Sequence, residues 1–93
     1  MTDPTLKLVV AWSERRNLCT LVREILATAE PEADLLPLGD DVTVMYTALS
    51  TGEVRDHLRD VLQSGDHVIV TEFEVWSSYG ADVDSRWLLA RGH

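Results

Sequence analysis

The chain has 93 residues, 45% of them hydrophobic, and its 16 Asp and Glu against 8 Lys and Arg give a net charge of −8. This length suffices for one domain, residues 1–93, whose core needs no disulfide or metal ion. The charge repels phosphate backbones, which argues against direct nucleic-acid binding and favours either a basic protein partner or high solubility.

The sequence also lacks the segments that are typical of exported or membrane proteins. No basic stretch precedes an apolar run in the manner of a signal peptide, and no apolar run approaches the length of about 18 residues that spans a bilayer. The single cysteine, Cys19, cannot form an internal disulfide. These observations predict a cytoplasmic protein that makes no membrane contact.

The N-terminal third is predicted to contain a strand and a helix. Residues 6–12, LKLVVAW, are mostly apolar and indicate a strand that is buried on both faces. The segment that follows has apolar residues at helical spacing. Ser13 is the candidate N-cap of this helix, and Pro31 is expected to end it.

A hairpin and a second helix are predicted next. A Gly-Asp-Asp turn separates two short strands near residues 34–38 and 42–48. Pro37 has no N–H group to donate, so the first of these strands is expected at an edge of the sheet. The pair Ser50 and Glu53 has the spacing of a capping box and predicts the start of the second helix.

The chain ends with a predicted long strand and a short extension. Residues 67–80, HVIVTEFEVWSSYG, begin with the alternation of a strand, and residues 84–93 are expected to form one helical turn. The order strand, helix, hairpin, helix, strand predicts an α+β fold. We expect a ferredoxin-like βαββαβ sandwich with an antiparallel sheet in the order 4-1-3-2, two helices on one face and a short C-terminal extension.

Alternation along the last strand predicts which residues lie on the face that the two helices leave bare. We expect Phe73 and its same-face neighbours to point toward the helices. The opposite set is predicted to form an interface on the bare face: Val68, Val70, Glu72, Glu74 and Trp76. This set is too apolar to stay fully hydrated, so the C-terminal segment, a second copy, or a ligand or partner is expected to cover part of it.

The predicted chemistry of the chain is sparse. Glu72 and Glu74 share a face at the spacing of a carboxylate pair, but we expect two surface charges that titrate near the usual value of about 4.3. No histidine pair has metal-ligand spacing, and no nucleophile motif or glycine-rich phosphate loop is present. We therefore predict no catalytic, cofactor-binding or metal-binding residue.

Two hypotheses about function remain. The first is a small acidic protein-interaction module, non-catalytic and homodimeric, that also suits a basic protein partner. The second is a cofactor-free enzyme of the monooxygenase or isomerase type, with a cleft lined by Trp12, Tyr46, His67, Glu72 and Trp76. A closed apolar pocket that contains one of these polar groups favours the enzyme, whereas a flat face favours the module.

Overall fold

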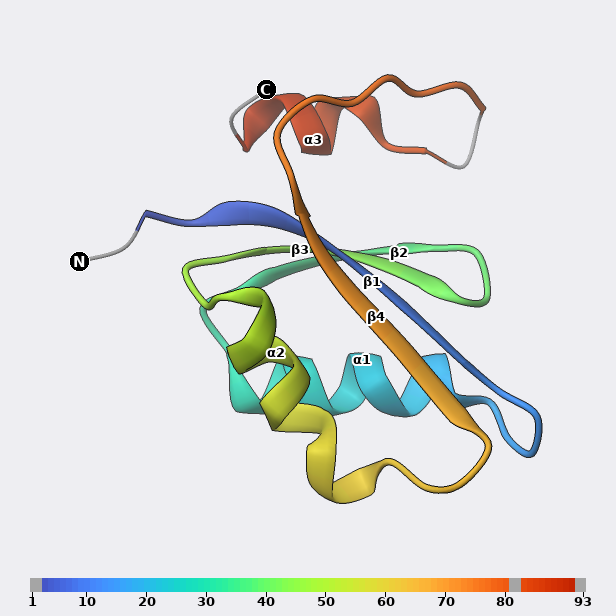
Figure 1. The fold of residues 1–93 in the computed structure, drawn as a ribbon. Coiled ribbons are helices and arrows are strands. Elements are labelled where there is room, and N and C mark those ends of the chain that lie inside the picture. The colour runs from blue at the N-terminus through green and yellow to red at the C-terminus, as the bar shows by residue number, and fades with distance from the viewer. Residues whose placement is uncertain (1–2, 81–82, 92–93) are drawn as a thin grey trace.

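The computed structural model describes residues 3–80 and 83–91, and it shows a four-stranded antiparallel sheet with helices packed on it (Figure 1). The predicted α+β class is therefore confirmed. Along the sheet the strands lie in the order β2-β3-β1-β4, and each neighbouring pair is antiparallel. In chain order the elements are β1 (Thr5–Ser13), α1 (Leu18–Ala29), β2 (Asp34–Leu38), β3 (Val42–Thr47), α2 (Thr51–Leu58), the 3-10 turn η1 (Arg59–Val61), β4 (Asp66–Phe73) and α3 (Ser85–Ala90).

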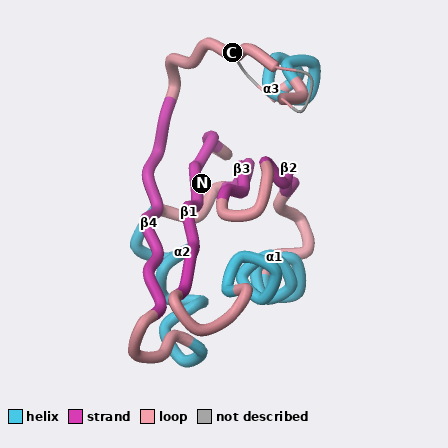
Figure 2. The backbone as a smooth tube through the Cα atoms, turned by 90° about the vertical axis from the view of Figure 1, so that its right-hand side faces the viewer, coloured by secondary structure: helices cyan, strands magenta, loops and turns pink. Residues whose placement is uncertain are grey.

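The helices lie in two layers on opposite faces of the sheet. Figure 2 shows α1 and α2 together on one side and α3 on the other. We call the first the helix side and the second the α3 side. The buried core of the helix side consists of Val9, Ala11, Leu18, Cys19, Val22, Leu26, Met45, Val54 and Leu58. The α3 side has a smaller buried cluster, formed by Leu6, Val44 and Leu88.

The predicted assignment of the two sheet faces is wrong. Val68 and Val70 pack against the helix-side core, whereas Phe73 packs on the α3 side. Across the sheet Lys7 pairs with Glu72 and Val9 with Val70, and Val9 belongs to the buried core of the helix side. Because α3 covers part of the second face, both faces of the sheet carry apolar residues, and alternation alone does not tell which set lies under α1 and α2.

The predicted last strand is also too long. β4 ends at Phe73, and a bend follows at Glu74. The period-two alternation stops there, so Trp76 does not share the face of Val70. Trp76 packs on the α3 side instead, beside Phe73. From Glu74 the chain crosses above the sheet to α3 (Figure 1). We call residues 74–80 and 83–91 the C-terminal segment.

The start of α1 differs from the prediction for a local reason. Ser13 is the last residue of β1, where it pairs with Asp66 of β4. Asn17 caps the helix instead, since its side chain accepts a hydrogen bond of 3.3 Å from the backbone N–H of Thr20. The predicted N-cap Ser13 is therefore wrong, because pairing with β4 extends β1 through this position.

The predicted capping box of α2 is confirmed. The Ser50 hydroxyl accepts from the Glu53 backbone N–H at 3.2 Å, and the Glu53 carboxylate accepts from the Ser50 N–H at 3.0 Å. These bonds satisfy N–H groups that the helix itself leaves without a partner. Replacing Ser50 with alanine should therefore lower the free energy of unfolding by about 1 kcal/mol, measured by urea denaturation. Ser64→Ala, at an exposed loop serine, is the matched control, and equal stabilities of the two variants would contradict this account.

Candidate functional site

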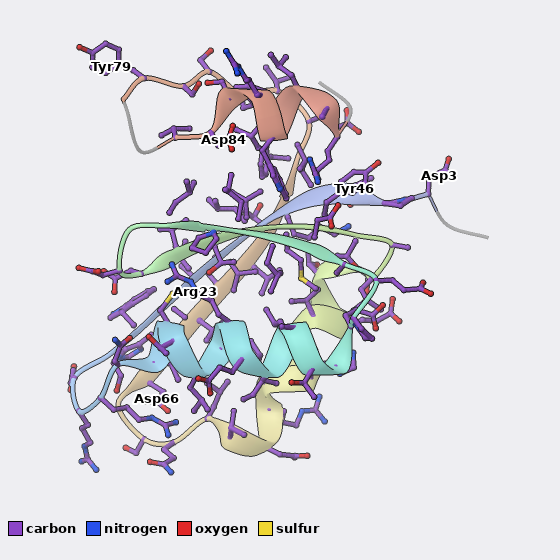
Figure 3. The ribbon with its side chains drawn as sticks, turned by 180° about the vertical axis from the view of Figure 1, so that it is seen from behind. Asp3, Arg23, Tyr46, Asp66, Tyr79 and Asp84 are labelled. Carbon is purple, nitrogen blue, oxygen red and sulfur yellow. The ribbon has the colours of Figure 1, made fainter. Side chains whose placement is uncertain are left out.

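Exposed apolar side chains lie on one side of the molecule. Of the large hydrophobic residues that the structure describes, the exposed ones are Trp12 (39% exposed), Ile69 (55%), Val75 (93%), Tyr79 (100%) and Leu89 (59%). Trp12 and Ile69 lie on the α3 side of the sheet, and the other three belong to the C-terminal segment. Figure 3 shows Tyr79 projecting away from the sheet. The helix side exposes no large hydrophobic residue among those described.

A groove separates the C-terminal segment from the sheet. It has a volume of about 370 Å³ and is open to solvent along one side. Apolar side chains from the sheet, including Leu8 and Leu38, form its floor, and the C-terminal segment, including Val75 and Trp76, forms its wall. The indole N–H of Trp76 is buried there without a hydrogen-bond acceptor. Such an unpaired donor costs about 1–3 kcal/mol.

An aromatic pair lies where the α3 side is bare. Trp12 of β1 and His67 of β4 are cross-strand neighbours, and their rings stack with centroids 5.2 Å apart. The Glu14 carboxylate lies 4.0 Å from His67 Nε2. This pair continues the apolar surface that starts at Ile69 toward the end of the sheet.

The edge of β4 holds a fixed carboxylate on the helix side. The Lys7 side chain is 2% exposed, and its ammonium group contacts the Thr5 hydroxyl, the Thr47 carbonyl at 3.3 Å and Glu72 Oε1 at 3.1 Å. Thr5 also donates to Glu72 Oε1 at 2.6 Å. The Thr5 hydroxyl, and after it Lys7, lowers the pKa of Glu72 below its ordinary value. The expected ordinary titration of Glu72 is therefore wrong.

A shallow depression borders the same edge. It has a volume of about 120 Å³ and lies between β4 and the first turn of α2. Val68 and Val70 form its strand wall, and Thr51, Gly52 and Arg55 form its helix wall. Both valines are only half-buried, so this end of the helix-side core is accessible from the edge of the sheet.

Asp66 forms a buried polar cluster that sequence reasoning missed. Its side chain is 1% exposed and forms an ion pair with Arg16. It also accepts from the Ser13 hydroxyl at 2.6 Å and from the Gln63 backbone N–H at 2.9 Å. Arg16, followed by Ser13, holds the pKa of this carboxyl well below its usual range. No local motif marks the cluster, because Asp66 lies 50 residues from Arg16 in the sequence.

The predicted enzyme cleft is not assembled. Trp76 lines the groove, whereas Trp12 and His67 stack farther along the sheet and Glu72 lies on the opposite, helix side. Within residues 3–80 and 83–91, no group of three or more His, Cys, Asp or Glu side chains is placed to hold a metal ion. Among the helices described, none has the length and apolar character needed to cross a bilayer.

The predicted interface residues are divided between the two sides of the sheet. Val68, Val70 and Glu72 lie on the helix side at the β4 edge, Glu74 is exposed after the strand, and Trp76 lies on the α3 side. Their role in binding stays a prediction. The exposed Tyr79 and Leu89 were missed, and their only signal in the sequence was the apolar content of the C-terminal segment.

Comparison with known proteins gives one relative. No protein family model matches the chain. Over 67 residues it is 36% identical to Uncharacterized protein PA3568 of Pseudomonas aeruginosa. The matched region covers 70% of this chain and 10% of that protein, so the chain corresponds to about a tenth of its relative. No solved structure matches.

Proposed function

We propose that the chain is a non-catalytic protein-interaction module that forms a homodimer through its α3 side. The observation that supports this proposal is the one-sided distribution of exposed apolar residues, with Trp12 and Ile69 on the sheet and Val75, Tyr79 and Leu89 on the C-terminal segment. Exposed apolar side chains that gather on one side of a domain favour a binding face there.

A second copy is the occupant that this surface fits best. The α3 side has both a groove of about 370 Å³ and side chains that project next to it, above all Tyr79. In a two-fold dimer each copy offers the same surface, so a Tyr79 that enters the groove of the partner copy is matched by the reciprocal contact. The mostly apolar groove lining suits an apolar insert, and tyrosine brings a large ring with a polar end.

The strand order β2-β3-β1-β4 and the two helices on one face support placing the fold among ferredoxin-like βαββαβ sandwiches. In this arrangement α3 is an addition that covers only part of the second face. The uncovered part of the sheet and the exposed side chains of the C-terminal segment together form the proposed dimer surface.

The test is the oligomeric state of Tyr79→Asp. The wild-type chain should be a dimer by light scattering coupled to size exclusion, and Tyr79→Asp should weaken self-association at least tenfold, because it places a charge in an apolar interface. Ala27→Asp, at an exposed position of α1 on the helix side, adds the same charge and should leave the dimer intact. Because each copy has a net charge of −8, wild-type association should strengthen with added salt. A wild-type monomer at millimolar concentration contradicts the proposal.

A further inference from the structure

We propose that the free edge of β4, together with the first turn of α2, binds an extended, lysine- or arginine-containing segment of another protein as a fifth strand of the sheet. This goes beyond the proposed dimer, because it uses the helix side and the edge, and its partner is a different protein. Strand addition of this type draws affinity from backbone hydrogen bonds and specificity from alternate side chains.

The two edges of the sheet differ in length and in composition. The β2 edge has five residues, contains Pro37, and is tied through Asp34 to Arg91 of the C-terminal segment. The β4 edge has eight residues without proline or lysine, and within the described residues it pairs only with β1. Sheets commonly protect edges by shortness, proline or charged side chains, lysine above all. β4 is long and has neither proline nor lysine, and its exposed edge charge is the single carboxylate of Glu72, so of the two edges it is the one suited to pairing with a basic segment.

A pocket for side chains lies beside the β4 edge. The depression of about 120 Å³ lies between Val68 and Val70 of the strand and the start of α2. An added strand places every second side chain on the helix side. Side chains opposite Val68 and Val70 would therefore enter or border this depression, and aliphatic residues match its strand wall.

The carboxylate of Glu72 at this edge favours a basic partner. Two residues beyond Val70, on the same side of the strand, lies Glu72, whose side chain is 49% exposed. Its contacts with Thr5 and Lys7 use Oε1, which orients the carboxylate and keeps it ionised. Glu74 follows, and the net charge of the chain is −8. Lys7 is buried behind Glu72 and offsets part of its charge, while the half-exposed carboxylate and Glu74 present the negative side to solvent, so a basic residue opposite Glu72 complements this edge.

These placements define a ligand pattern. In an antiparallel fifth strand the residue opposite Glu72 comes first, and those opposite Val70 and Val68 follow at intervals of two. The pattern is therefore basic, any, aliphatic, any, aliphatic. The capped peptide Thr-Lys-Thr-Val-Thr-Val-Thr is the simplest probe of it.

The experiment is a titration of the isotope-labelled protein with this peptide, followed by NMR chemical-shift changes. Shifts should concentrate in β4 and in residues 51–55 of α2. The peptide with glutamate in place of lysine should bind about tenfold more weakly. Glu72→Gln should reduce the affinity for the lysine peptide about two- to fivefold, the effect of one exposed ion pair. Glu24→Gln, at an exposed position of α1, is the matched control and should bind as the wild type does.

Two proline-containing peptides test strand pairing itself. Only every second N–H of an added strand points toward β4. The two peptides carry proline at adjacent central positions. The peptide whose proline removes an N–H that bonds to β4 should not bind, and the peptide whose proline removes an N–H that points to solvent should still bind. Equal affinity for the lysine and glutamate peptides, equal tolerance of both prolines, or shifts centred on Trp76 and the groove would each overturn the proposal.

The dimer proposal and the β4-edge proposal can be tested independently of each other. Tyr79→Asp lies outside β4 and α2, so this variant should keep its affinity for the lysine peptide even when it no longer dimerises. Loss of peptide binding in that variant would show that the β4 site depends on the dimer and would overturn the independent site proposed here.

Discussion

Replacing Leu88 with alanine should lower the free energy of unfolding by about 2–5 kcal/mol. Leu88 is 4% exposed, and it packs from α3 onto Leu6 and Val44 of the sheet. Its removal leaves a cavity between the C-terminal segment and the α3 side. We expect a loss near the lower end of the range, because the adjoining groove is open and water can enter it.

The neighbouring leucine is the matched control for this variant. Leu89 is also a leucine and is the next residue of α3, but it is 59% exposed, so Leu89→Ala should change stability by no more than about 0.5 kcal/mol. Urea denaturation at low micromolar protein, where dimerisation contributes least, compares the two. Equal effects of the variants would show that α3 does not pack on the sheet through Leu88.

Replacing Asp66 with asparagine should lower the free energy of unfolding at neutral pH. The same replacement should make the free energy of unfolding decrease less as the pH falls into the acid range. The carboxylate accepts hydrogen bonds from Ser13, Arg16 and the Gln63 backbone. Asparagine has nearly the same shape, but its amide NH₂ turns a donor toward Arg16 or the Gln63 N–H. The part-buried guanidinium of Arg16 then lacks its counter-charge, and the asparagine NH₂ group faces another hydrogen-bond donor.

The pH dependence follows from the direction of the pKa shift. Folding lowers the pKa of Asp66 below its value in the unfolded chain, which is about 3.9. The stabilisation from Asp66 is therefore complete above that unfolded pKa, and it is lost as the pH falls toward the lower pKa of the folded state. The stability difference between wild type and Asp66→Asn should accordingly be largest near pH 7 and shrink below about pH 4.

Unfolding in urea at several pH values measures this difference. Asp60→Asn, at an exposed position of η1, is the control and should follow the wild-type pH profile. A constant difference between wild type and Asp66→Asn from neutral pH to pH 3 would mean that the charge of Asp66 is not what stabilises the fold.

Features that depend on neighbouring residues in the chain were predictable. The capping box of Ser50 and Glu53 was found correctly because its hydrogen bonds join groups three residues apart. Pro37 was correctly placed in an edge strand, because a missing N–H is a property of the residue itself. The α+β class followed from the spacing of apolar residues, which reports local periodicity.

Features that depend on contacts between distant segments were not predictable in the same way. The Asp66 cluster was missed, since nothing near Asp66 in the sequence indicates its ion pair with Arg16. Trp76 does lie on the face that α1 and α2 leave bare, but Val68 and Val70 do not share it, because they pack against the core under these helices. The groove and its buried indole exist only because α3 returns to the sheet.

The sequence by itself determined the order of the main strands and helices, since this order depends on local periodicity. Only the tertiary structure decided which face of the sheet each set of residues occupies. Alternation divides a strand into two sets but is symmetric between them. The packing of α1 and α2 on one face and of α3 on the other decides between the two sets. For this reason Val68, Val70 and Glu72 lie at the helix-side edge, while Ile69 lies on the α3 side.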